Sequence, residues 1–206
     1  MIEKTQMLSS KEIEKQIENY KLDFPQVRDE RIEWGTKLPM FVATFNKLIQ
    51  EKGAVPSQDD FVKRYFEDNS AELSSVISSE IPKAGLEARL RRTYPSLVRD
   101  VHFESLLREN GLDVTHDPHS DVFGGVDHVI RYQGHVFYIH CYVNTRAGRY
   151  GRRLKNRRHD FQGIHLNVPM ALDAGTSKSA GDFYLYSEKH VDYLLELMTN
   201  ELKKLK

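Results

Sequence analysis

A run of arginines between residues 146 and 158 has the residue types best suited to one chemistry, the binding of phosphate. Between Arg146 and His159 the sequence holds seven Lys or Arg residues and no Asp or Glu, and arginine outnumbers lysine six to one. Guanidinium groups form paired hydrogen bonds with phosphate oxygens, and an aromatic ring can stack on an exposed base. The segment predicts a nucleic-acid contact through Arg146, Arg149, Tyr150, Arg152, Arg153, Lys155, Arg157 and Arg158.

Two glycines lie inside this basic segment. Gly148 and Gly151 lower its helix propensity and would let a phosphate backbone approach closely. Two other interpretations of the segment remain open. It can be a solvated basic face, or it can bind an acidic protein partner such as the N-terminal part of the chain.

Two strand-like segments precede the basic segment and carry ionisable side chains. Val126 to Tyr132 and His135 to Val143 alternate in side-chain type, and Gln133-Gly134 between them is typical of a hairpin turn. On such a hairpin Asp127 can face the same side as His140. A carboxylate suits a hard ion such as Mg²⁺, whereas an imidazole suits Mn²⁺ or zinc better.

The order of elements in residues 86–206 resembles that of the PD-(D/E)XK nuclease superfamily, the restriction-endonuclease-like fold. The resemblance rests on Phe103 to Leu107, on Gly124 to Ile130 and on the strand Val136 to Val143. In that family a helix supplies a glutamate, and a hairpin supplies an aspartate and then a Glu-x-Lys triplet. The carboxylates bind a divalent metal ion, and the lysine helps to position or activate water.

The resemblance implies Glu104, Asp127 and His140 as catalytic residues, with Glu104 and Asp127 as metal ligands. Mg²⁺ or Mn²⁺ would be the cofactor if the site is active. His140-Cys141-Tyr142 stands where the Glu-x-Lys triplet is expected, and Tyr142 cannot supply the positive charge of a lysine. These departures weigh against an ordinary active nuclease.

Each candidate also has a purely structural interpretation. Asp127 can hydrogen-bond a loop, Glu104 can pair with Arg108 one helical turn away, and His140 can be a satisfied core histidine. Cys141 falls on the apolar face of its strand, which favours a structural thiol over a nucleophile. A polar turn is the favoured interpretation of the metal-ligand types at His116, Asp117, His119 and Asp121.

The elements that must position these residues divide the chain near residue 85. Residues 1–85 predict a helical region, with serine caps before Lys11 and at Ser57 and a helix stop at Gly53. Gly35 and Pro39 interrupt the second helical stretch, which predicts either a kink or two helices.

Residues 86–206 predict a helix to Gly111 with a possible break at Pro95, a short strand and the hairpin. Strands over 164–168, ended by Pro169, and over 182–186 come next, and a helix opens at Ser187. The predicted fold is α/β (α+β): an N-terminal helical region, 1–85, and a restriction-endonuclease-like mixed sheet flanked by helices, 86–206.

Composition narrows the functional class. The 206 residues carry zero net charge and 39% hydrophobic residues, and the single cysteine excludes a disulfide framework. No apolar run is long enough to span a bilayer, so we expect a cytoplasmic protein with no membrane contact. We expect a nucleic-acid-binding accessory subunit that acts on DNA. Two alternatives stay open: an active metal-dependent endonuclease, and a protein-interaction subunit whose helical region docks on a partner.

Overall fold

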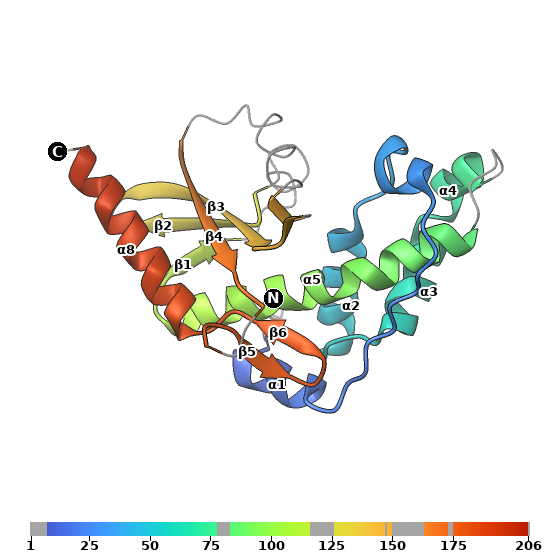
Figure 1. Ribbon diagram of the computed structural model, residues 1–206, viewed down its shortest axis with the longest axis horizontal. Helices are drawn as coiled ribbons and strands as arrows, with labels where there is room; N and C mark the ends of the chain where they lie inside the picture. Colours follow the sequence, from blue (N-terminus) through green and yellow to red (C-terminus); the bar gives the residue numbers. More distant parts are fainter. Residues whose placement is uncertain are drawn as a thin grey trace, which may run out of the picture.

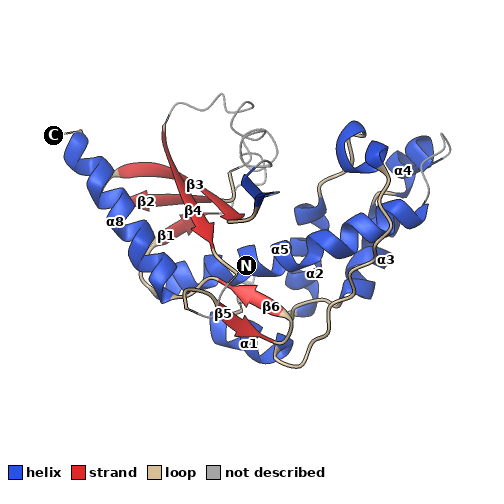
Figure 2. Ribbon diagram, viewed as in Figure 1, coloured by secondary structure: helices blue, strands red, loops and turns tan. Residues whose placement is uncertain are grey.

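The computed structural model describes residues 8–77, 83–115, 126–146, 148–149, 163–172 and 175–205, and its architecture is mixed α/β (Figures 1 and 2). The predicted fold class is confirmed at that level. The helices are α1 (Ser10–Ile17), the π-helical turn η1 (Arg31–Gly35), α2 (Phe41–Lys52), α3 (Gln58–Asp68), α4 (Ser70–Ile77), α5 (Lys83–Glu109) and α8 (Glu188–Lys204). The strands are β1 (Asp113–Thr115), β2 (His128–Tyr132), β3 (His135–Val143), β4 (Ile164–Met170), β5 (Lys178–Ala180) and β6 (Phe183–Leu185).

Four of these strands form one mixed sheet in the order β1-β2-β3-β4. The first three are antiparallel neighbours, and β4 runs parallel to β3. The predicted hairpin is confirmed, and its turn residues Gln133 and Gly134 both have positive φ, at 49° and 81°. Strands β5 and β6 form a separate antiparallel pair.

Helix α5 joins two buried cores. It runs from the helical group on one side of the molecule to the sheet on the other (Figure 1). Its first half contributes Leu90 and Tyr94 to a core of helices that also takes Phe183 from β6. Its second half contributes Phe103 and Leu107 to the core beneath the sheet. The predicted boundary near residue 85 therefore falls at the start of a helix that belongs to both cores.

The helix ends follow the local sequence signals. Ser9 caps α1 by accepting the N–H of Glu12 at 3.2 Å, and Ser57 caps α3 by accepting the N–H of Asp60 at 3.1 Å. Gly53 ends α2 with a φ of 60°, as the left-handed conformation at a helix C-terminus favours glycine.

Two prolines do not interrupt their elements as the sequence predicts. Helix α5 continues through Pro95, because the carbonyl of Arg91 that a proline leaves without a helical donor accepts the side-chain amide of buried Gln58 at 3.0 Å. Strand β4 continues through Pro169 to Met170. It is the outer strand of the described sheet, where a missing N–H is tolerated.

Candidate nucleic-acid interface

The first two arginines of the basic segment follow directly after β3. A short helical turn begins there, because Thr145 accepts the N–H of Gly148 through its hydroxyl at 3.1 Å and the N–H of Arg149 through its carbonyl at 2.9 Å. Arg149 also donates to the side-chain oxygen of Asn144 at 2.9 Å. Arg146 and Arg149 are exposed. Arg149 is therefore oriented by its neighbours while its guanidinium group remains accessible to a phosphate.

Gly148 has a structural reason to be a glycine. A Cβ at this position would overlap the carbonyl oxygen of Val143, so the close backbone approach is to the chain itself. The other predicted contacts lie outside the residues that the structure describes: Tyr150, Arg152, Arg153, Lys155, Arg157 and Arg158.

Asp127 lies directly before β2 and continues the pairing of the hairpin with β3. Its N–H donates to the carbonyl of Ile139 at 2.9 Å, and its Oδ2 accepts the N–H of Cys141 at 2.6 Å. The carboxylate thus serves as a backbone-like acceptor for β3. This contact supports the structural interpretation that the sequence left open for this residue.

His140 lies fully buried at the position where the resemblance expects an acid. Its Nε2 is 2.9 Å from Nδ1 of His165 on β4, and the two rings stack with centroids 5.2 Å apart and planes within 12°. The ring of Tyr138 stacks on the other histidine at 5.0 Å. His140 is therefore a core histidine with His165 as its partner, which supports the structural interpretation of this residue.

His165 is the member of this site that sequence reasoning missed. Parallel pairing of β3 with β4 places Tyr138 opposite His165 and His140 opposite Asn167, so these side chains share one face. The sequence predicts a strand over 164–168, but its neighbour and register depend on a chain crossover. The only sequence signal that could have found His165 is its place in a strand-like run that follows the hairpin.

The opposite face of the sheet is apolar. Cys141 packs there against the core beneath the sheet, together with Phe137 and Ile139, as the alternation predicted. Tyr186 lies in the same core, where its ring stacks on Phe103 at 4.2 Å. Burial raises the pKa of the Tyr186 phenol well above its usual value. Burial therefore keeps the Tyr186 phenol neutral near neutral pH.

Glu104 is engaged with a neighbour on its own helix. It pairs with Arg108 at 2.6 Å, and Arg108 also donates to the carbonyl of Val114 in β1 at 2.9 Å. Glu104 and His128 line the same small cavity of about 10 Å³ between α5, α2 and the start of β2. The helix therefore does approach the hairpin, but the glutamate itself forms the predicted i, i+4 ion pair.

Glu104, Asp127 and His140 do not form a metal-binding group in this structure. Among the described residues, no set of three or more His, Cys, Asp or Glu side chains is placed to hold a metal ion. The cluster His116, Asp117, His119 and Asp121 lies outside the described residues. The predicted magnesium or manganese cofactor stays a prediction.

Comparisons with protein-family models, curated proteins and solved structures find no match for this chain. No helix in the described part of the chain is long and apolar enough to cross a membrane.

Proposed function

We propose that the chain binds nucleic acid, with DNA as its target, through the basic segment that follows β3. The observation that supports this most is the position of Arg146 and Arg149, which are exposed just after β3. The buried histidine of that strand, His140, is already hydrogen-bonded to His165. Residues 86–206 would then form a degenerate restriction-endonuclease-like domain that binds nucleic acid through its surface without cleaving it. The protein would act as an accessory subunit.

Two further features support this proposal. Helix α5 precedes the β2–β3 hairpin, with β1 between them, as the PD-(D/E)XK resemblance implies, and Asp127 lies directly before β2. The carboxylates that would hold a metal have other partners, since Glu104 pairs with Arg108 and Asp127 accepts from Cys141. The observed contacts favour binding over hydrolysis.

The test is a binding titration with labelled single- and double-stranded DNA and RNA at several salt concentrations. The variant Arg146→Glu/Arg149→Glu should bind at least about tenfold more weakly, and its salt dependence should fall by about two ions. The matched control is Lys15→Glu/Lys63→Glu, which makes the same change in charge at exposed positions on α1 and α3. It should bind like the native protein.

The same titration discriminates the alternatives. Equal loss of affinity in both double variants would mean that net charge alone matters, and the proposed interface would be wrong. Cleavage that requires Mg²⁺ or Mn²⁺ and disappears in Asp127→Ala would make the protein an endonuclease. No binding to any nucleic acid would leave a protein partner of the helical region 1–85.

A further inference from the structure

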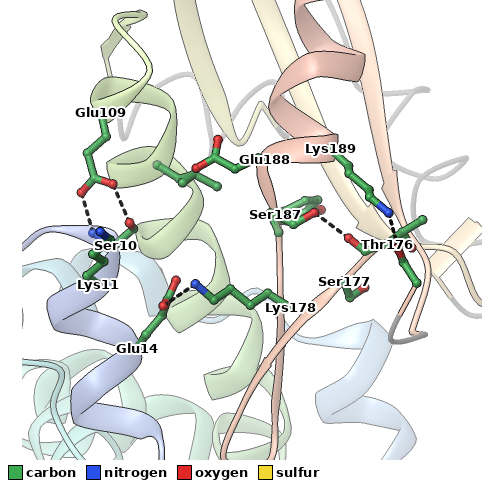
Figure 3. Close-up of a pocket in the computed structure, with 13 residues that line it drawn as sticks. Ser10, Lys11, Glu14, Glu109, Thr176, Ser177, Lys178, Ser187, Glu188 and Lys189 are labelled. Atoms are coloured by element: carbon green, nitrogen blue, oxygen red, sulfur yellow. Dashed lines mark hydrogen bonds and ion pairs between the residues drawn. The ribbon is translucent and has the colours of Figure 1, made fainter.

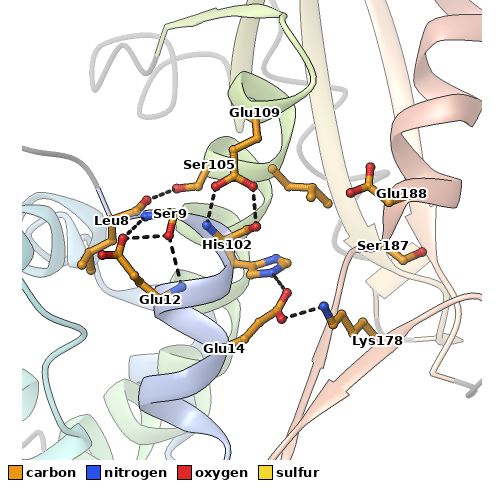
Figure 4. Close-up of polar contacts among 12 residues, drawn as sticks. Leu8, Ser9, Glu12, Glu14, His102, Ser105, Glu109, Lys178, Ser187 and Glu188 are labelled. Atoms are coloured by element: carbon orange, nitrogen blue, oxygen red, sulfur yellow. Dashed lines mark hydrogen bonds and ion pairs between the residues drawn. The ribbon is translucent and has the colours of Figure 1, made fainter.

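A buried histidine lies where α1, α5 and β5 meet, away from the proposed interface. His102 of α5 is fully buried, and its Nε2 is 2.9 Å from a carboxylate oxygen of Glu14 on α1. The other oxygen of Glu14 is 2.6 Å from the ammonium group of Lys178 on β5. Figure 4 shows this chain of three side chains, which links three elements distant in sequence.

The three side chains together carry no net charge when His102 is neutral. The Nε2–H of a neutral His102 can donate to the Glu14 carboxylate, whose charge is balanced by Lys178. The remaining ring nitrogen, Nδ1, is buried and has no hydrogen-bond partner among the residues that the structure describes. A further proton on Nδ1 would therefore leave a buried N–H without an acceptor, on a ring whose counter-ion Glu14 is already shared with the ammonium group of Lys178.

Three charged groups of the described residues act on His102. They are Glu14 from α1, Lys178 from β5 and Glu109 from α5 itself. Glu109 is already bound by the N–H of Ser10 at 2.7 Å. Burial is the largest influence and lowers the pKa of His102 below its usual 6.5, against the opposing effect of Glu14. Burial tends to raise the pKa of Glu14, but hydrogen bonds from Lys178 and His102 lower it below its usual 4.5.

We propose that His102, Glu14 and Lys178 form an acid-operated latch, in which protonation of His102 releases α1 and the β5–β6 hairpin from α5. The proton can be accommodated only if the ring reaches water, and that requires its covering elements to move. The folded state with the latch closed keeps its full stability above pH 6.5 and loses it as the pH falls below that value. Glu14 remains charged over that interval, so His102 is the group that changes.

The latch also bridges two walls of a cleft. Glu14 and Lys178 both line a cleft of about 430 Å³ between α1, the end of α5 and the segments 175–178 and 186–189. In Figure 3 the two side chains reach toward each other from opposite walls. Release of this pair would separate the walls, so acidification should open the cleft as well as loosen α1.

Hydrogen exchange of the whole protein at pH 7.5, 6.5 and 5.5, corrected for the intrinsic effect of pH, tests the latch. One proton drives the opening, so protection of α1 and β5–β6 should fall with pH below 6.5, by up to about tenfold per pH unit, while α8 keeps its protection. His102→Gln keeps an N–H donor for Glu14 but cannot take up a proton. This variant should show no pH-dependent loss.

The matched control is His128→Gln, since His128 is also buried but packs on Phe103 beneath the sheet. It should retain the loss of protection in α1. The proposal is wrong if the native protein shows no loss, or if His102→Gln shows the same loss. Should His102→Gln fail to fold, an NMR titration of the native protein decides. A His102 midpoint at or above pH 6.5 would overturn the latch.

Discussion

The helical core and the sheet core are built from different side chains. In the helical core the rings of Phe45, Phe61 and Tyr94 lie 5.7 to 6.3 Å apart, and the Tyr94 hydroxyl donates to the carbonyl of Pro56 at 2.5 Å. In the sheet core, aliphatic side chains from four strands pack against α5 and α8. Two histidines, His128 and His140, are buried in the sheet.

The two cores also differ in whether their side chains can change charge near neutral pH. All nine histidines of the chain lie at residue 102 or later, so the helical region has no histidine. Burial raises the pKa of Tyr65 and Tyr94 far above their usual values, which keeps both phenols neutral. The helical core therefore keeps a constant charge near neutral pH. The sheet and the junction with α1 hold the groups that can take up or share a proton.

The largest effect should come from the centre of the helical core. Tyr94→Ala should lower the free energy of unfolding by about 3–5 kcal/mol, because it removes a buried ring that contacts four other rings. Tyr94→Phe keeps the ring and removes one hydrogen bond, so it should cost about 0.5–1.5 kcal/mol. Urea denaturation measures both. Similar losses in the two variants would show that the hydroxyl, and not ring packing, stabilises this core.

The next largest loss of stability is expected in the β5–β6 hairpin, and it tests whether this hairpin belongs to the helical core. Gly181 has a φ of 54°, and a Cβ there would overlap the carbonyl oxygen of Ile17 at the end of α1. Gly134 in the other hairpin has a φ of 81°, but a Cβ would meet no atom of the described residues within 4 Å. Gly134→Ala should therefore cost only the backbone strain, about 1–2 kcal/mol.

Gly181→Ala should cost about 2–5 kcal/mol, because overpacking against backbone adds to the same strain. The comparison uses thermal and urea unfolding of both variants. Equal losses would mean that the hairpin can move away from α1 without cost. The hairpin would then be less tightly attached to the helical core than Phe183 and Gly181 indicate.

Local signals in the sequence predict the ends of elements well. The caps at Ser9 and Ser57, the stop at Gly53 and the hairpin turn at Gln133-Gly134 are all confirmed. Each depends on a hydrogen bond or a backbone conformation within a few residues. Such features are encoded where they occur.

Partners distant in the sequence could not be predicted in this way. Pro95 is tolerated because Gln58, far away in the chain, supplies a donor to the helix. His140 is paired with His165 because β4 takes one register against β3 out of several. The sequence predicts no strand at β5, whose Lys178 pairs with Glu14 and so completes the set of three side chains with His102. These partners depend on tertiary packing, which no local pattern encodes.

A smaller effect is expected at Asp127, where the sheet carries its candidate chemistry. Asp127→Ala should lower the free energy of unfolding by about 1–3 kcal/mol, because the N–H of Cys141 loses its acceptor. Asp127→Asn keeps an oxygen acceptor and should cost less than about 1 kcal/mol. Chemical denaturation and the DNA titration together give the result. If Asp127→Asn is stable and still binds DNA but abolishes a metal-dependent cleavage, the carboxylate is catalytic and not structural.

The smallest effect is expected at Glu104, and it separates the two carboxylates that the nuclease resemblance groups together. Glu104→Gln removes an i, i+4 ion pair with Arg108, whose side chain is 33% exposed. Pairs of this kind contribute about 0.3–0.5 kcal/mol, so the free energy of unfolding should change by no more than that. Arg108 keeps its bond to the carbonyl of Val114, which limits the loss. Denaturation in low and high salt measures the change, which should shrink as salt screens the pair. A loss above about 2 kcal/mol would mean that Glu104 supports the sheet core as Asp127 does, and that the end of α5 positions the hairpin through charge.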